Sequence, residues 1–211
     1  MTQNKLPGGS QDSADPAEPT DSTDSTDSAA SAHSTGSPDR ASRRYTGYVI
    51  EVISQEVQLP NGQVVGLDLI RHPGASAVVP FLSRDKVMLI RHYRYAVGGT
   101  LFEVPAGKLE PGEAPEACAA RELEEETGWR AGKLELLGSI WTSPGFTDER
   151  IHLYAAHDLD PTEQRLQKDE IIELVPMPLE EALNLVWSGQ LSDAKSALAL
   201  VYAARREGLL R

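Results

Sequence analysis

Short apolar runs and tight turns follow one another along most of the chain after residue 44. Two β-rich runs, residues 48–59 and 63–72, flank Pro60-Asn61-Gly62. Asn-Gly between such runs is typical of a β-hairpin. Further runs of this kind are expected to form strands. These runs are residues 75–83, 86–94, 101–107, 133–142, 150–159 and 171–177. The pattern predicts a sheet-rich domain.

Apolar positions at helical spacing occur in three other segments. Residues 114–127 have Pro115 in the first turn and Gly128 at the end, where these residues suit an α-helix. The other two segments are residues 178–189 and 192–206. Ser192 is the expected N-cap of the last helix. Strands and helices are segregated rather than alternating, which predicts the α+β class.

Residues 1–43 differ from the rest in composition. They are mainly Ser, Thr, Asp, Ala, Pro and Gly, with the near-repeat TDSTDSTDS. Such a segment cannot bury enough apolar surface to offset the entropy lost on ordering, so we expect a disordered tail. The folded domain is then expected to span residues 44–211, with residues 44–72 as an N-terminal antiparallel β-strand extension.

Charge and cysteine content narrow the possible partners and compartments. The 211 residues carry a formal net charge of -12, which argues against nonspecific binding to nucleic acid or to an anionic membrane. No run approaches the roughly 18 apolar residues of a membrane span, and the N-terminus has no signal-peptide pattern. Cys118 is the single cysteine, which fits a reducing compartment. We therefore expect a soluble, cytoplasmic protein.

The densest charge lies in RELEEETG, residues 121–128, which has four glutamates in five positions. On a helix, Glu122, Glu125 and Glu126 share one face, while Glu124 points away. Like charges at this spacing destabilise an isolated helix by roughly 0.2–0.5 kcal/mol per pair. A bare glutamate run is most simply a solvated face. Three converging carboxylates are also the ligands that a hard divalent cation prefers.

The wider stretch GKLEPGEAPEACAARELEEETGW, residues 107–129, favours the cation site. Its fixed positions are Gly107, Glu113, Arg121, Glu122, Leu123, Glu125, Glu126 and Gly128. This spacing resembles the Nudix box, the signature of Nudix hydrolases. Trp129 stands where an aliphatic residue is more usual, which does not affect the chemistry. The resemblance extends from about Tyr45 to Arg211.

The resemblance implies a Nudix fold, with a mixed β-sheet sandwiched between helices. It also implies hydrolysis of a nucleoside diphosphate linked to another group. Glu122 and Glu126 would bind Mg²⁺, for which Mn²⁺ can substitute, and Glu125 would assist. Arg121 would orient a box carboxylate. The backbone carbonyl of Ala106, just before the box, would add a ligand.

Other segments resemble the ADP-ribose pyrophosphatase subfamily. Pro144, in SPGFTDE, follows Trp129 by fifteen residues, as a proline does in that group, although Pro-Gly is by itself an equally good turn signal. The implied substrate-binding residues are Arg94, Glu103, Gly107 and Pro144. The implied reaction is Mg-dependent hydrolysis of ADP-ribose to AMP and ribose 5-phosphate.

A glutamate in a loop well after the box commonly serves such enzymes as general base or as an added metal ligand. Within residues 163–174, Glu170 matches that position best. Asp169 is adjacent and is a possible substitute, whereas Glu163 and Glu173 are weaker choices. The alternative is an ordinary solvated loop acid.

The resemblance further implies a homodimer, formed through the strands of residues 44–72, and a small nucleotide as the partner. Two other functions stay open. One is a Nudix diphosphatase for another sugar nucleotide, such as a GDP-sugar. The other is a non-catalytic nucleotide-sensing Nudix module, which the complete box disfavours. The sequence does not identify the residue that stacks on the nucleotide base of the substrate.

Overall fold

The computed structural model describes residues 42–210. The predicted disordered tail therefore lies outside the described residues, except for its last two positions, which are in a strand. The strands are β1 (Ser42–Thr46), β2 (Glu51–Gln58), β3 (Val64–Arg71), β4 (Ala75–Ser83), β5 (Lys86–Arg94), β6 (Gly99–Glu103), β7 (Ala106–Lys108), β8 (Trp129–Trp141), β9 (Arg150–Pro161) and β10 (Ile172–Pro178). The helices are α1 (Pro115–Thr127), α2 (Leu179–Trp187) and α3 (Ala194–Arg206), with a 3-10 turn, η2 (Tyr95–Val97).

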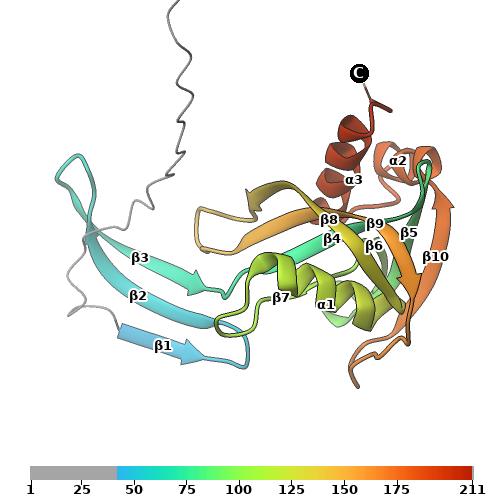
Figure 1. The fold of residues 1–211 in the computed structure, drawn as a ribbon. Helices are drawn as coiled ribbons and strands as arrows, with labels where there is room; N and C mark the ends of the chain where they lie inside the picture. The colour runs from blue at the N-terminus through green and yellow to red at the C-terminus, as the bar shows by residue number, and fades with distance from the viewer. Residues whose placement is uncertain (1–41, 211) are drawn as a thin grey trace, which may run out of the picture. The chain divides into compact units, whose positions relative to one another are not determined.

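The first three strands form an antiparallel sheet, β1-β2-β3 (Figure 1). The predicted hairpin between β2 and β3 is confirmed. Gly62 has a φ of +84°, which a glycine adopts without the steric cost paid by other residues. Its N–H donates to the carbonyl of Leu59 at 2.8 Å. Near the end of β3, the N–H of Ile70 donates to the carbonyl of Phe146, and its carbonyl accepts from the N–H of Asp148.

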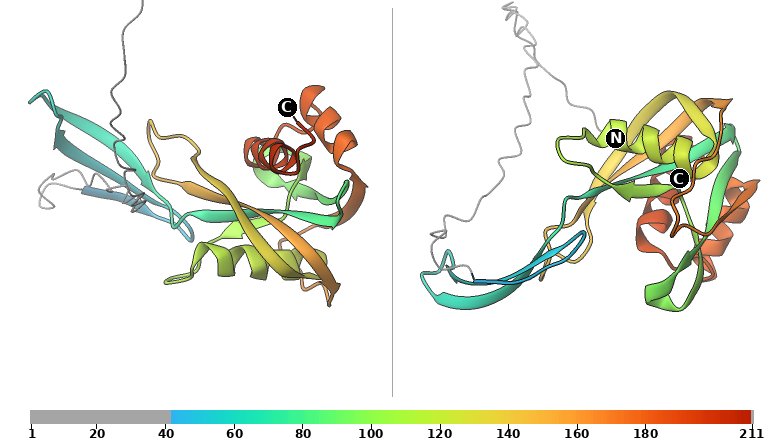
Figure 2. Two further views of the ribbon diagram at one scale, coloured as in Figure 1. Left: turned by 45° about the horizontal axis from the view of Figure 1, so that its top comes forward. Right: turned by 90° about the horizontal axis from the view of Figure 1, so that it is seen from below.

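The main sheet has the strand order β10-β5-β4-β9-β8, with β6 paired to β5 and β7 paired to β4. Strands β4 and β9 are parallel, and the other pairs are antiparallel. Helix α1 lies on one face of this sheet, and α2 and α3 lie on the other (Figure 2). The expected mixed sheet between helices is therefore confirmed.

Alternation along β4 separates two hydrophobic cores. Ala77 and Val79 belong to the larger core, which contains buried residues of α2 and α3. Val78, between them, belongs to the smaller core with Ala119 and Leu123 of α1. Burying a side chain of this size contributes roughly 1.5–3 kcal/mol. Because α1 is anchored through this apolar side, its glutamate side is fixed in orientation.

Helix α3 begins differently from the prediction. Ser192 was the expected N-cap, but Asp193 occupies that position, and its carboxylate accepts a hydrogen bond from the N–H of Ser196 at 3.0 Å. Asp193 has the extended backbone that an N-cap requires. The hydroxyl of Ser196 accepts a hydrogen bond from the N–H of Val104 at 2.9 Å. The start of α3 is thereby joined to the segment between β6 and β7.

The helices found in residues 42–210 are all too short or too polar to cross a membrane.

Candidate active site

A cavity of about 600 Å³ contains most of the predicted site residues. It is bounded by β5, β7, α1, the loop before β10 and the start of α3. The predicted residues that line it are Arg94, Ala106, Gly107, Arg121, Glu122, Glu126 and Glu170. Segments more than 70 residues apart in the chain thus contribute to one site.

Arg121 is the cation that holds the glutamates of α1 together. Its Nη1 donates to Glu122 Oε1 at 2.6 Å and to Glu125 Oε2 at 3.3 Å. Its Nε and Nη2 donate to the two carboxylate oxygens of Glu113, at 2.9 and 3.0 Å. These hydrogen bonds to Arg121 hold the pKa of Glu113 at about 2. The repulsion within the glutamate run is therefore partly offset by a neighbour in the same box.

The side chains of Glu122 and Glu126 are buried, which is unusual for carboxylates. Burial raises the pKa of both groups, and the charge of Glu170 adds to this effect. The N–H of Ala106 donates to Glu126 Oε2 at 3.0 Å. Gly107 provides the space for Glu122, since a Cβ on Gly107 would lie 1.9 Å from Glu122 Oε1. The box glycine is thus required by close approach.

These residues fit a divalent cation in their chemistry. Within residues 42–210, no three His, Cys, Asp or Glu side chains already stand together as a formed metal site. Arg121 donates a hydrogen bond to Glu122, and the amide of Ala106 donates one to Glu126. Both glutamates line the cavity, as does Glu170. Carboxylate oxygens are the ligands that a hard divalent ion prefers.

The loop before β10 brings Glu170 to the cavity, together with Asp169. The carboxylate of Glu170 accepts a hydrogen bond from the N–H of Gln167 at 2.7 Å. Of the weaker candidates, Glu173 is on β10 and forms an exposed ion pair with Arg91 at 3.1 Å. Glu163 is absent from the residues that line the cavity. The geometry therefore leaves Glu170 and its neighbour Asp169 as the loop acids at the site.

Arg94 and Glu103 form a bidentate ion pair, with both N···O distances 2.9 Å. Lys195 of α3 also donates to Glu103, at 2.6 Å, and to Asp193, at 2.9 Å. Glu103 is buried, and its two oxygens are occupied by these cations, so it supports Arg94 from beneath rather than facing the cavity. Lys195 itself lines the cavity. The sequence did not indicate Lys195, because one lysine on an amphipathic helix reads as a solvated residue.

Besides Glu103, two predicted residues lie outside the cavity. Pro144 is exposed in the turn between β8 and β9 and does not line it. Glu125 is on the predicted face of α1 but bonds to Arg121 rather than pointing into the cavity. Both departures have the same cause. The spacing of residues predicts the helix face or the loop on which a residue lies, but the direction of its side chain depends on tertiary contacts.

Three further side chains complete the description. Tyr93 and Tyr95 line the cavity, and Tyr95 is 89% exposed, so they offer aromatic surface at its edge. Cys118 is fully buried. Burial raises the pKa of its thiol to about 11, as is typical of an unreactive, buried cysteine.

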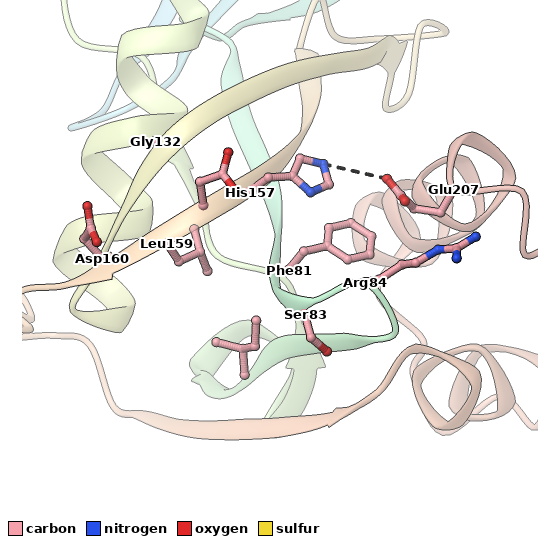
Figure 3. Close-up of a pocket in the computed structure, with 10 residues that line it drawn as sticks. Phe81, Ser83, Arg84, Gly132, His157, Leu159, Asp160 and Glu207 are labelled. Carbon is pink, nitrogen blue, oxygen red and sulfur yellow. Dashed lines mark ion pairs between the residues drawn. The ribbon is translucent and has the colours of Figure 1, made fainter.

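A separate cavity of about 680 Å³ contains none of the predicted residues (Figure 3). It lies between the β4–β5 turn, β9 and the end of α3. His157 stacks on Phe81 with ring centroids 4.9 Å apart, and its Nε2 lies 3.8 Å from Glu207. Asp158, Asp160 and Glu207 line this cavity, but no residue of the glutamate run on α1 does.

Known proteins are similar to this chain along most of its length. The family model described as "NUDIX domain" matches residues 70–200. The chain is 42% identical to the ADP-ribose pyrophosphatase of Bacillus subtilis (strain 168), over 78% of this chain and 90% of that protein. It is 41% identical to the methanol dehydrogenase activator of Bacillus methanolicus, with the same coverage.

A third relative, the GDP-mannose pyrophosphatase of Citrobacter koseri, is 33% identical over 74% of this chain and 87% of that protein. A crystal structure of an ADP compounds hydrolase aligns with a TM-score of 0.70. The alignment covers 81% of this chain and 94% of that chain at 22% sequence identity, which is a similarity of fold.

The ion cluster around Glu103 predicts a specific pH dependence of stability. Burial raises the pKa of Glu103, but Arg94 and Lys195 outweigh it and hold the pKa at about 2, against an ordinary 4.5. Because the folded-state pKa is lowered, this stabilisation is complete above pH 4.5 and is lost as the pH falls towards 2. Glu103→Gln should lower the free energy of unfolding at pH 7 by about 3 kcal/mol.

Urea unfolding at pH 7, 4.5 and 3 measures this effect. The difference in the free energy of unfolding between wild type and Glu103→Gln should become smaller below pH 4.5. Glu173→Gln is the matched control, because its ion pair with Arg91 is exposed and should contribute less than about 1 kcal/mol. A difference that stays constant at all three pH values would contradict the assignment.

Proposed function

The chain belongs to the NUDIX family, and on that premise we propose that it hydrolyses the diphosphate bond of ADP-ribose to give AMP and ribose 5-phosphate. The observation that carries the proposal is the pair of buried carboxylates, Glu122 and Glu126, beside Glu170 in one cavity. The relative from Bacillus subtilis that is named an ADP-ribose pyrophosphatase supports this substrate. GDP-mannose is the second candidate, because a GDP-mannose pyrophosphatase is also a relative.

Members of this family use divalent metal ions, and we propose Mg²⁺, with Mn²⁺ as a substitute. Glu122, Glu126 and the carbonyl of Ala106 would hold it, with Glu170 as a further ligand or as the base. When bound, the cation supplies neutralisation of the diphosphate oxygens and a polarised water. Arg121 keeps Glu122 in place through its 2.6 Å hydrogen bond.

The remaining steps are assigned to side chains of the cavity. As the base, Glu170 would accept the proton of the attacking water, because its carboxylate lines the cavity beside Glu122 and Glu126. Arg94 binds a phosphate oxygen, while its ion pair with Glu103 fixes its orientation. Tyr95 offers the exposed aromatic surface on which the nucleotide base of the substrate can stack.

The lone, buried thiol of Cys118 supports a cytoplasmic location, which cell fractionation would test.

Product analysis tests the function. Wild-type protein with Mg²⁺ should convert ADP-ribose to AMP and ribose 5-phosphate, and a parallel incubation with GDP-mannose measures the competing substrate.

Glu126→Gln should nearly abolish turnover while the protein stays folded, because the neutral amide is a poor metal ligand. Glu124→Gln is the matched control, since Glu124 pairs with Arg130 and Arg165 away from the cavity. Near-normal activity of Glu126→Gln at limiting Mg²⁺ would refute the metal assignment.

The loop acid is tested separately. Glu170→Gln should lower kcat about a hundredfold, the scale of lost general-base assistance, while KM changes little. Asp169→Asn is the comparison within the same loop. If Glu170→Gln keeps the wild-type kcat and Asp169→Asn does not, the proton acceptor is Asp169.

We also propose a homodimer formed through the β1–β3 sheet. The support is apolar exposure on and near these strands, at Tyr45, Tyr48, Val49, Val64 and Leu67. Sedimentation equilibrium should give twice the chain mass. Replacing Val64 and Leu67 by serine should shift the protein to monomer. A monomeric wild type at micromolar concentration would refute the proposal.

A further inference from the structure

The side chain of His92 is buried, and it has no role in the Nudix box or in the ion pairs described above. It lies on β5, lines the cavity and is only 3% exposed. Its Nδ1 is buried and has no hydrogen-bond partner within residues 42–210. The same atom lies 4.0 Å from Glu126 Oε1. The unpartnered nitrogen is therefore aimed at one of the two buried box carboxylates.

An unpaired polar group in this position is costly. Leaving a buried donor or acceptor without a partner carries its full desolvation penalty, and most such groups in folded proteins are paired. Burial and the charge of Arg94 lower the pKa of His92. A neutral imidazole carries one N–H and one lone pair. It can donate to a carboxylate without adding positive charge beside a cation.

The carboxylate of Glu126 has one oxygen available for such a donor. Glu126 Oε2 accepts the hydrogen bond from the N–H of Ala106. Glu126 Oε1 lies 4.0 Å from His92 Nδ1, which is beyond hydrogen-bond distance. The carboxylate oxygen would have to move by roughly 1 Å towards Nδ1 to form the bond. Since β5 is paired with β6 and β10 on its two sides here, at Leu101 and Ile172, His92 is the more rigid partner.

We infer that His92 is a positioning residue, whose Nδ1–H donates to Glu126 Oε1 and holds that carboxylate in the orientation that binds the divalent cation. The inference rests on the proposed function, because it requires Glu126 to be a metal ligand. Groups that hydrogen-bond to a metal ligand fix its orientation, and their loss typically weakens metal binding roughly 10–100-fold.

Metal affinity, rather than turnover, provides the test. Mn²⁺ binding to the full chain is measured by calorimetry without nucleotide. His92→Leu should weaken Mn²⁺ binding roughly 10–100-fold. His92→Asn should restore much of the affinity, because the Asn amide nitrogen takes the place of Nδ1. His152→Leu is the matched control: His152 is also a strand histidine of lowered pKa, but it bonds to Ser139 and does not line the cavity.

The outcomes separate this inference from the proposed function. Wild-type affinity in a folded His92→Leu variant would overturn the inference alone. Failure of the wild-type protein to bind Mn²⁺ would overturn the proposed metal site and the inference with it. Equal losses in His92→Leu and His92→Asn would also overturn it, because the donor would then be irrelevant.

If His92→Leu does not fold, nitrogen-15 NMR of the wild type gives an independent answer. Adding Mg²⁺ should slow the exchange of the His92 Nδ1 proton with water, because that proton becomes hydrogen-bonded. An exchange rate that is unchanged at saturating Mg²⁺ would overturn the inference.

Discussion

The site depends on one constraint, the burial of two glutamates one helical turn apart. Glu122 and Glu126 lie on the same side of α1, where their charges repel and burial raises the pKa of both. The guanidinium of Arg121 and the amide of Ala106 each engage one of them. The box glycine is needed for the same reason, since only the absence of a Cβ at Gly107 leaves room for Glu122.

The rest of the fold holds these carboxylates in place. Leu123 anchors α1 in the smaller core, on the side of the helix away from the cavity. On the other face of the sheet, α3 reaches the site through Ser196, which bonds to Val104, and through Lys195, which bonds to Glu103. The two hydrophobic cores lie on opposite faces of β4, which pairs with the strands that carry Arg94 and Ala106. A change in the packing of α3 would reach the site through these bonds.

Charge is distributed unevenly in this acidic protein. The chain has a net charge of -12, yet the substrate proposed for it is anionic. Arg94, Lys108, Arg121 and Lys195 line the cavity, together with the acidic side chains of Glu110, Glu122, Glu126, Glu149, Asp169 and Glu170. Most of these cations are already paired with carboxylates, which fixes their geometry. Local pairing, rather than net charge, decides what the cavity can bind.

The sequence by itself determined most of the strands and helices and the class of fold. Apolar periodicity and turn residues suffice for these, because they act over a few neighbouring positions. The β2–β3 hairpin, the α1 helix with its Gly128 cap and the shared face of Glu122 and Glu126 are all local in this sense. The tertiary structure alone decided that Lys195 and His92 line the cavity and that Pro144 does not. These depend on contacts between distant segments, whose directions are set by packing and not by spacing along the chain.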